Sequence, residues 1–465
     1  MPREISAEGV PAFEAIAGAG GPITDQRIPD LKDLARLFFF SAGITKKRSH
    51  PGGEILFRAA ACTGALYHIE LYLVCGDLPG LEAGVYHVGM HDFALRRLRS
   101  GDHRGTMARA AAGEEATAAS PAVLVLTTTF WRNAWKYQAR AYRHAFWDSG
   151  TVLANLLAVA HSSLIPARLV LGFADEPVNR LLSLDTDREV AVAVVPCGRG
   201  PSPPDADPPA PPLELATAPL SKTEVDYPAI REMHAASSLV TQEEVATWRG
   251  AAPTAESPPA TGRLTPLEPN GLAAGGGSVE QVILRRGSSR RFARDSITLV
   301  QLANALDAST RGIDADFLDP SGHPLNDLYL IVNAVEGLSP GAYLYHPAWP
   351  AAGALELLME GDFRDVSGHL GLEQELPADA AVNVFFLADL RRVLDRYGNR
   401  GYRAAEIEAG IVGGKLYLAA YAQGFGATGL TFFDDEVTDF FSPHAEGKSV
   451  MFLMALGRSF QRRRG

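Results

Sequence analysis

The sequence predicts an α+β fold built from two tandem copies of one domain, each with helices around a central sheet. Two observations lead to this prediction. Blocks of sequence recur at a nearly constant spacing in the two halves of the chain, and each half mixes apolar helical segments with short β-rich runs. At 465 residues the chain is also too long for a single ordinary core.

The repeat is clearest in two pairs of segments. "YLVCGDLPGLEAGVYHV" (72–88) matches "YLIVNAVEGLSPGAYLY" (329–345), with Tyr72 recurring 329 − 72 = 257 positions later. "RNAWKYQARAYRHAFWDSG" (132–150) matches "RRVLDRYGNRGYRAAEIEAG" (391–410), with Tyr142 recurring 402 − 142 = 260 positions later. The later pairs "GFADE" with "FFDDE" and "PCGR" with "ALGR" keep the same order. We therefore expect one domain copy in residues 1–200 and the other in residues 278–465.

The elements follow from local patterns. Short apolar, β-rich runs predict strands, and longer apolar segments predict buried helices. Ser278 followed by Gln281 is a capping box that starts a helix. The expected strands are 68–76, 121–130, 190–198 and 449–457, and the expected helices include 148–163, 298–306 and 408–423.

Residues 201–277 separate the two copies. Segments such as "GPSPPDADPPAPPLELATAPL" are rich in Pro, Ala and Gly, a composition typical of extended or mobile linkers. The stretch "DYPAIREMHAASSLVTQEEVATW" between them predicts one short helix. We therefore expect a linker with a central anchor point.

Composition excludes several classes of function. A net charge of −11 argues against general nucleic-acid binding. The longest apolar runs fall short of the roughly 20 residues that a membrane span needs. The N-terminal residues lack the pattern of a signal peptide. The three cysteines are sparse and odd in number, as in a reducing cytoplasm. No metal site is expected, because neither the cysteines nor His68, His144 and His161 have a second ligand at metal spacing.

"RRGSSRRF" (285–292) is a candidate site for a phosphate, because charge-assisted donors suit an anion with several oxygens. When the starts of the halves are aligned, the offset is 297 − 28 = 269. Arg286, Ser288 and Arg290 then fall on Ala17, Ala19 and Gly21. We call Arg286, Ser288 and Arg290 the phosphate grip. The first half is predicted to lack equivalent residues.

The first half carries features that the second lacks. "RAAACTGALYHIELYLV" (58–74) is a loop of small residues entering a strand, where backbone N–H groups can approach a flat ligand. Lys136–Tyr137 stands where the second half has Arg396–Tyr397. Lysine can act as a base near neutral pH in a suitable environment, whereas arginine stays protonated. The two halves are therefore predicted to be complementary.

These motifs resemble the nitroreductase family of FMN enzymes. "RRGSSRRF", "GFGATGLTFFDD" and the terminal "ALGR" carry the resemblance in the second half. The first half, with "RAAACTGALY" and "WKYQARAYR", is similar to the SagB-type branch, which contains azoline dehydrogenases. The resemblance covers both halves but not the linker. It implies two nitroreductase-like domains, each with a mostly antiparallel sheet, forming an intramolecular pseudo-dimer with one complete FMN site between them.

The resemblance also implies roles for particular residues. The second half would supply the phosphate contacts and the loop beside the flavin ring, and the first half would supply the other ring contacts and a Lys-Tyr pair typical of the azoline-oxidising branch. The implied cofactor-binding residues are Arg286, Ser288, Arg290, Arg458, Gly429, Leu430, Thr431, Cys62, Thr63 and Gly64. The implied catalytic residues are Lys136 and Tyr137.

The expected function is FMN-dependent oxidation of thiazolines or oxazolines to thiazoles or oxazoles in a ribosomally made peptide. Its partners would be the azoline-containing precursor peptide and a cyclodehydratase complex, in the cytoplasm. Two alternatives remain at this point: an NAD(P)H-dependent nitro- or quinone reductase, and a non-catalytic partner in a peptide-modifying complex without FMN.

Overall fold

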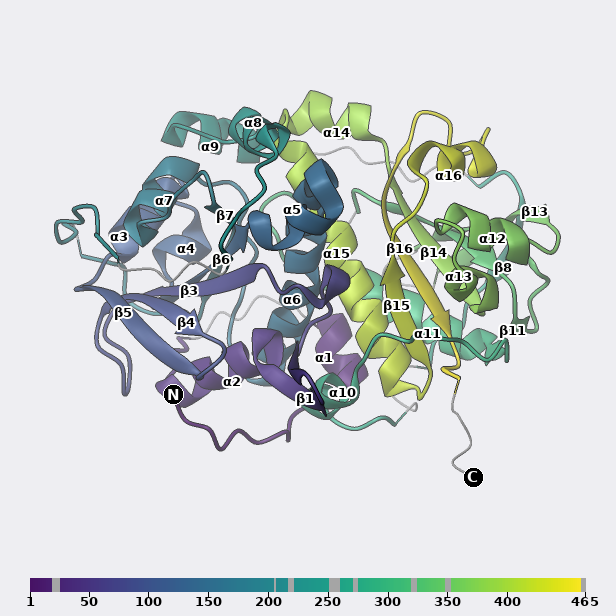
Figure 1. The fold of residues 1–465 in the computed structure, drawn as a ribbon, viewed down its shortest axis with the longest axis horizontal. Coiled ribbons are helices and arrows are strands. Elements are labelled where there is room, and N and C mark those ends of the chain that lie inside the picture. The colour runs from purple at the N-terminus through teal and green to yellow at the C-terminus, as the bar shows by residue number, and fades with distance from the viewer. Residues whose placement is uncertain are drawn as a thin grey trace.

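The computed structural model describes residues 1–18, 26–204, 206–215, 221–250, 260–270, 275–318, 324–347 and 353–460. Of the first-half counterparts of the phosphate grip, Ala17 lies in helix α1 (Ala12–Gly18), while Ala19 and Gly21 lie outside the described residues. Figure 1 shows two lobes, one formed by each half of the chain, on either side of two long central helices.

The first half contains a five-stranded antiparallel sheet in the order β5-β4-β3-β6-β7. Its central strands β3 and β6 are almost entirely buried and mostly apolar, as expected for the middle of a sheet covered by helices. A separate hairpin, β1 with β2, extends from this half. The strands are β1 (Ile44–His50), β2 (Gly53–Arg58), β3 (Ile69–Cys75), β4 (Gly84–Gly89), β5 (Ala94–Ser100), β6 (Ala122–Thr129) and β7 (Glu189–Cys197).

The second half repeats this plan in a seven-stranded antiparallel sheet, β15-β16-β14-β10-β12-β13-β8. The order β12-β10-β14-β16 matches β4-β3-β6-β7 of the first half. The strands are β8 (Arg263–Pro266), β10 (Asp327–Val332), β12 (Gly341–His346), β13 (Ala354–Glu360), β14 (Val382–Ala388), β15 (Gly426–Leu430) and β16 (Ser449–Gly457), and a short parallel pair is formed by β9 (Ile297–Thr298) and β11 (Val335–Glu336). The predicted fold class is confirmed.

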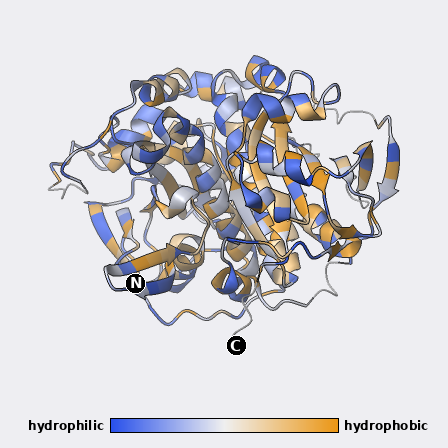
Figure 2. Ribbon diagram, turned by 45° about the vertical axis from the view of Figure 1, so that its right-hand side comes forward, coloured by the Kyte–Doolittle hydropathy of each residue, from blue (hydrophilic) through white to orange (hydrophobic). Residues whose placement is uncertain are grey.

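Helices flank both sheets, and hydrophobic residues gather in the strands and the central helices (Figure 2). The capping box predicted at Ser278 and Gln281 is present at the start of α10. The first half contains α1, α2 (Leu31–Ala42), α3 (Arg104–Ala110), α4 (Glu115–Ala118), α5 (Trp131–Tyr137), α6 (Ala141–Ser162) and α7 (Asp175–Leu182). The second half contains α10 (Val279–Arg285), α11 (Leu299–Thr310), α12 (Arg364–Leu370), α13 (Glu375–Asp379), α14 (Leu390–Tyr397), α15 (Arg400–Ala422) and α16 (Asp434–Phe441).

The two halves meet along α6 and α15, which cross at a pair of repeated glycines. A Cβ atom on Gly150 would lie 2.6 Å from the backbone of Gly410, and a Cβ atom on Gly410 would lie 2.6 Å from the backbone of Trp147. The rings of Tyr142 and Tyr402, which are also repeat partners, stack nearby with an interplanar angle of 8°. The internal repeat therefore forms a pseudo-dimer around these helices.

The segment expected to be a linker contains two helices rather than one, α8 (Pro228–Ala236) and α9 (Gln242–Gly250), and it supplies the edge strand β8. Ile230 and Trp248 are buried against the two halves. These apolar side chains explain why this part of the segment is ordered despite its flanking composition. None of the helices in the described ranges is both long and apolar enough to cross a bilayer.

Candidate functional site

A cavity of about 690 Å³ lies between the two halves, a volume within the usual range for cofactor sites. Residues of both halves line it. Eleven of the twelve residues predicted for the site are among them, five from the first half and six from the second. They are Cys62, Thr63, Gly64, Lys136 and Tyr137, together with Arg286, Ser288, Arg290, Gly429, Leu430 and Thr431.

Arg458 is the predicted residue that the cavity lining does not include. Its Nε donates a hydrogen bond of 2.9 Å to the carbonyl oxygen of Ser296. In this structure the side chain therefore holds the loop before β9 and does not face the cavity.

The loop after α10 forms one end of the cavity. Arg286 is buried, and its guanidinium donates to the carbonyl oxygens of Ala59 at 2.9 Å and Arg58 at 3.3 Å, both in the first half. Its guanidinium also lies over the ring of Tyr417. The Ser288 hydroxyl is 3.0 Å from that tyrosine's oxygen. Burial lowers the pKa of Arg286. This loop is thus fixed by contacts to both halves.

Further cations line the same cavity. Lys46, on β1, donates from Nζ to the carbonyl oxygens of Arg285, at 3.0 Å, and of Arg286. Burial and the neighbouring Arg286 lower the pKa of Lys46. Arg48 and Arg58 of the same hairpin also line the cavity, and Asp148 is the one carboxylate among the described lining residues. The charge balance of the cavity favours an anionic ligand.

The small-residue loop forms the other end. It contains a single 3-10 turn at Thr63–Ala65, in which Gly64 has φ 63°. Ala65 (φ 54°) and Tyr67 (φ 49°) share this uncommon left-handed region. Non-glycine residues hold such a conformation only where their surroundings impose it. The loop is therefore a strained segment facing the cavity.

Asp148, on α6, imposes that conformation. Its carboxylate accepts hydrogen bonds from the backbone N–H and the hydroxyl of Thr63, each at 3.0 Å, and from the Cys62 thiol at 3.2 Å. The neighbouring Trp147 donates from Nε1 to the Thr63 hydroxyl at 2.8 Å. One helix turn thus fixes the backbone of the loop.

The sequence showed no second metal ligand at a suitable spacing from His68, but the structure places Cys62 and Asp148 beside it. Potential ligand atoms of Cys62, His68 and Asp148 all lie within 4.8 Å of one another. The arrangement is nevertheless satisfied without an ion. His68 Nε2 is 2.8 Å from the Asp148 carboxylate, and burial raises the pKa of Cys62, which keeps the thiol protonated as a donor. We assign a hydrogen-bonded cluster here.

Glu408 occupies the equivalent position in the second half, since 148 + 260 = 408. Its carboxylate accepts from the backbone N–H groups of Leu325 and Asn326, at the loop that precedes β10. A carboxylate at the equivalent position of α6 and of α15 thus holds the loop before the equivalent strand, β3 in the first half and β10 in the second. Burial raises the pKa of Glu408 to about 7 from its ordinary value of 4.5.

This shift predicts a pH-dependent stability. Between about pH 4.5 and pH 7 the folded chain binds the Glu408 proton more tightly than the unfolded chain, so stability falls as the pH rises through this window. Glu408→Gln, which carries no titrating proton, should show a smaller fall in thermal unfolding midpoint across the window. Glu176→Gln, at a carboxylate that is 66% exposed, is the control and should keep the wild-type slope. Equal slopes in the wild type and Glu408→Gln would contradict the assignment.

Lys136 and Tyr137 end α5 and face the cavity from the first half. The Lys136 ammonium lies 5.2 Å from the centre of the Tyr137 ring. Tyr137 packs edge-on against His144, whose pKa burial lowers well below its ordinary value. A Cβ atom on Gly64 would lie only 2.8 Å from the Tyr137 hydroxyl. Glycine at that position therefore permits the close approach of the loop and the tyrosine.

The strand end Thr428–Thr431 lines the cavity opposite this pair. The resemblance to FMN enzymes implies that this loop lies beside the flavin ring, where a backbone N–H can contact the ring edge. The Gly429 N–H donates at 2.7 Å to the Tyr417 hydroxyl. Leu430 pairs with Leu453 of β16, so Thr431, beyond the end of β15, is the better placed for such a contact.

In the second half, the space that corresponds to the cavity beside Tyr137 is occupied by a side chain of the linker. Trp248 of α9 is buried, and its Nε1 donates at 3.0 Å to the carbonyl oxygen of Tyr397, the counterpart of Tyr137. The two rings are 5.2 Å apart. The side chain thus fills the space beside Tyr397 that in the first half belongs to the cavity.

Comparison with known proteins agrees with this geometry. The nitroreductase family profile matches residues 54–199 and 283–458, which is more than half of the chain and includes both halves. A protein of Methanocaldococcus jannaschii, provisionally named a nitroreductase, is 25% identical over 169 residues, which is 36% of this chain and 80% of that protein.

Solved structures show the same similarity. The crystal structure of a protein from Anabaena variabilis, provisionally described as a nitroreductase, has a TM-score of 0.76 and 26% identity, covering 95% of this chain and 94% of that one. A chain of the E. coli microcin synthetase McbBCD complex with truncated pro-MccB17 bound has a TM-score of 0.35 and 21% identity, over 43% of this chain and 77% of that one. The latter score is too low to carry an argument about function.

Proposed function

Because the chain belongs to the nitroreductase family, we propose that it is an FMN-dependent dehydrogenase that oxidises thiazoline or oxazoline rings in a peptide. One observation carries the proposal. The Lys136–Tyr137 pair of the first half and the phosphate grip of the second half line the same cavity. Neither half alone contains both features.

The residues present fit FMN by their chemistry. A phosphate group needs cationic and hydroxyl donors, and Arg286, Ser288 and Arg290, joined by Lys46, provide them at one end. A flat ring needs small residues and backbone groups on its faces and edge, and the Cys62–Gly64 loop and Gly429–Thr431 provide these at the other end. When bound there, FMN would supply the hydride acceptor for the oxidation.

The chain's own residues would do the remaining work. Lys136 is proposed to take the proton that the azoline ring loses, while Tyr137 positions the ring. Asp148 holds the strained loop through Thr63 and Cys62, so that the substrate meets a fixed surface. The product would be the aromatic thiazole or oxazole.

The peptide partner follows from the substrate. Azolines in peptides are made from cysteine, serine or threonine by cyclodehydration, so we propose that the enzyme acts after a cyclodehydratase on its precursor peptide, in the cytoplasm. The domain limits proposed for this arrangement are residues 1–200 and 278–465, with β8 of the intervening segment added to the second sheet.

The test is direct. The purified chain should be yellow, contain about one FMN per chain, and convert a synthetic thiazoline-containing peptide to a product lighter by two hydrogen atoms. Mass spectrometry and flavin absorbance measure both results. A flavin content near two per chain would refute the single-site arrangement. Rapid bleaching by NADPH with turnover of nitroaromatics, but none of azolines, would favour a nitro- or quinone reductase. Absence of FMN would favour a non-catalytic partner.

A further inference from the structure

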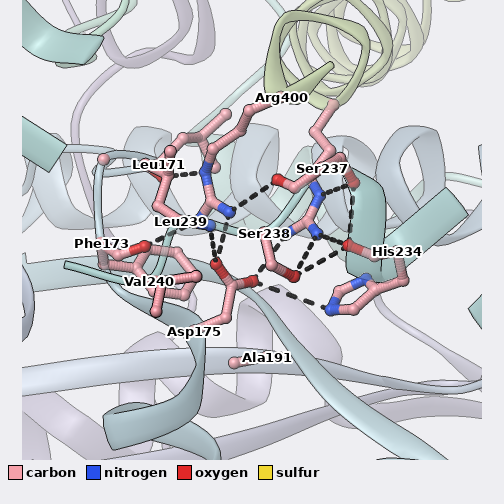
Figure 3. Close-up of polar contacts among 12 residues, drawn as sticks. Leu171, Phe173, Asp175, Ala191, His234, Ser237, Ser238, Leu239, Val240 and Arg400 are labelled. Carbon is pink, nitrogen blue, oxygen red and sulfur yellow. Dashed lines mark hydrogen bonds and ion pairs between the residues drawn. The ribbon is translucent and has the colours of Figure 1, made fainter. Parts of the chain in front are cut away.

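A buried cluster of charges binds the linker to both halves of the molecule (Figure 3). Asp175 of α7 pairs with Arg400 at 2.6 Å and with Arg403 at 2.8 Å, and all three side chains are at most 5% exposed. The two arginine ion pairs outweigh the effect of burial and lower the pKa of Asp175 to about 2. Asp175 is therefore ionised at neutral pH, as the two arginines are.

The linker bound by this cluster is held through its main chain. The carbonyl oxygen of His234 accepts from Arg403 at 2.7 Å, and that of Ser237 accepts from Arg400 at 3.2 Å. The Leu239 N–H donates to the Asp175 carboxylate at 3.0 Å, and its carbonyl oxygen accepts from the Asp175 N–H. These residues form the last turn of α8 and the turn that follows it, and the Ser237 and Ser238 hydroxyls also accept hydrogen bonds from Arg403. The cluster therefore binds mainly the carbonyl oxygens of a chain turn, together with small hydroxyl side chains.

The internal repeat places a second copy of this cluster beside the cavity. Arg140 and Arg143 are the counterparts of Arg400 and Arg403, since 140 + 260 = 400 and 143 + 260 = 403. They pair with Asp434 at 2.7 Å and 2.6 Å, as the other arginines pair with Asp175. Phe432 lies beneath both guanidinium groups, as Phe173 lies beneath Arg400. The two clusters thus share two arginines, an aspartate at the first position of a helix and a supporting phenylalanine.

The copies differ in what covers them. Arg140 and Asp434 are each 35% exposed and Arg143 is 13% exposed, whereas the linker seals the other copy. The Nε of Arg140 is inaccessible to solvent and has no hydrogen-bond partner within the described part of the chain. Its counterpart, Arg400 Nε, donates to the carbonyl oxygen of Leu171 at 2.6 Å. The open cluster is therefore less fully hydrogen-bonded than the sealed one at this buried atom.

The charge of the open cluster suits a peptide backbone better than an anion. Glu406 lies 3.3 Å from Arg143 on its buried side, where the first half has Phe146 at the matching position. Burial raises the pKa of Glu406 to about 7. With Asp434 and Glu406 opposite two arginines, little net positive charge remains. Carbonyl dipoles gain from such a site, while a free phosphate or carboxylate gains less.

The open cluster also adjoins the cavity. Arg140 follows Tyr137 by three residues, and its Nη2 donates to the carbonyl oxygen of Phe432 at 3.1 Å. Phe432 follows Thr431, which lines the cavity. A peptide bound at the cluster would therefore lie next to the cavity and could present a ring within it.

We propose that Arg140, Arg143 and Asp434 bind the main chain of the peptide substrate, as Arg400, Arg403 and Asp175 bind linker residues 234–239 at the end of α8. The identity of the substrate as a peptide rests on the proposed function, whereas the binding geometry rests on the internal repeat. The chain's own linker serves as the template for the bound peptide.

The experiment uses the full flavin-loaded chain and a fluorescent synthetic peptide of residues 233–241, "MHAASSLVT". Fluorescence anisotropy should show saturable binding, weakened about tenfold or more in Arg140→Gln, because a charge-assisted hydrogen bond is lost. Arg294→Gln is the matched control, since that arginine also pairs with an aspartate but lies outside the cavity lining, and it should bind as the wild type does. FMN content should be equal in all three proteins.

Turnover gives a second readout. Arg140→Gln should raise the KM for a peptide-borne thiazoline and leave turnover of a small free thiazoline unchanged. Absence of binding of the 233–241 peptide to the wild type, or equal binding by wild type and Arg140→Gln, would overturn the proposal. Arg140-dependent binding without oxidation of any azoline would support the docking surface and refute the proposed chemistry, so the two failures are distinguishable.

Discussion

Replacing Lys136 with alanine is expected to leave a yellow, folded protein that oxidises azolines about 10²- to 10⁴-fold more slowly, the usual contribution of a positioned base. The residue is exposed at the end of α5, and its ammonium contacts the face of Tyr137. Its removal leaves no buried partner unpaired and creates no cavity in the core, so the fold should survive. Steady-state turnover of a thiazoline peptide and FMN absorbance measure the two effects separately.

The Lys136→Arg variant distinguishes a role of Lys136 as a base from a role in orienting the substrate ring. The second half carries arginine at the matching position, Arg396, so this substitution copies a residue that the repeat already accommodates. Arginine keeps the positive charge but stays protonated at neutral pH, and therefore cannot serve as a base. We expect Lys136→Arg to be as slow as the alanine variant. Recovery of activity in the arginine variant would instead assign Lys136 a role in orienting the ring, and unchanged turnover in Lys136→Ala would exclude both roles.

Short contiguous motifs in the sequence predicted most of the candidate residues that the structure places around the cavity. The phosphate grip, the small-residue loop and the Lys-Tyr pair are each local, and the repeat indicated that they belong to opposite halves. Their convergence on one cavity follows from the crossing of α6 and α15, which the repeat implies but does not place. The motif "ALGR" was less informative. Its last residue, Arg458, can point toward the cavity or away from it, and in the structure it bonds to the carbonyl oxygen of Ser296.

Other site residues had weak signals in the sequence. Asp148 lies in a helix whose apolar composition indicated only burial, and its hydrogen bonds to Thr63 and Cys62 join positions more than 80 residues apart. Lys46 belongs to a basic run in an exposed hairpin, a pattern more typical of a solvated surface. Only the fold brings it to the carbonyl oxygen of Arg286. Long-range contacts of this kind leave no periodicity in the chain.

The linker shows a similar limit. Its Pro, Ala and Gly content predicted an extended segment, yet Trp248 and Ser237 bind to residues of the two halves. The first fills the space beside Tyr397, and the second accepts a hydrogen bond from Arg403. These contacts depend on surfaces created by the repeat, so composition alone could not predict them. They also make the two faces of the pseudo-dimer unequal, with one cavity open and its counterpart filled.

Replacing Gly410 with alanine is expected to destabilise the whole chain by about 2–4 kcal/mol, in the range of severe overpacking. The added methyl group would lie 2.6 Å from the Trp147 Cα, and backbone atoms on a rigid helix cannot rotate away. The helices α6 and α15 would have to separate. Because Asp148 and Tyr417 project from these helices into the cavity lining, their separation should also weaken the retention of FMN.

Gly250→Ala provides the control that separates crowding from helix propensity. Gly250 ends α9, and a Cβ atom there would meet nothing within 4 Å. Alanine favours a helix over glycine by about 1 kcal/mol in helix interiors, and less at an end, so this variant should be as stable as the wild type or slightly more stable. Thermal unfolding with flavin release as a second signal compares the three proteins. If Gly410→Ala unfolded at the wild-type temperature with its flavin retained, the two halves would not depend on the close crossing of α6 and α15. The shared cavity would then need some other contact, such as that of Arg286 with the Arg58 and Ala59 carbonyls, to hold it together.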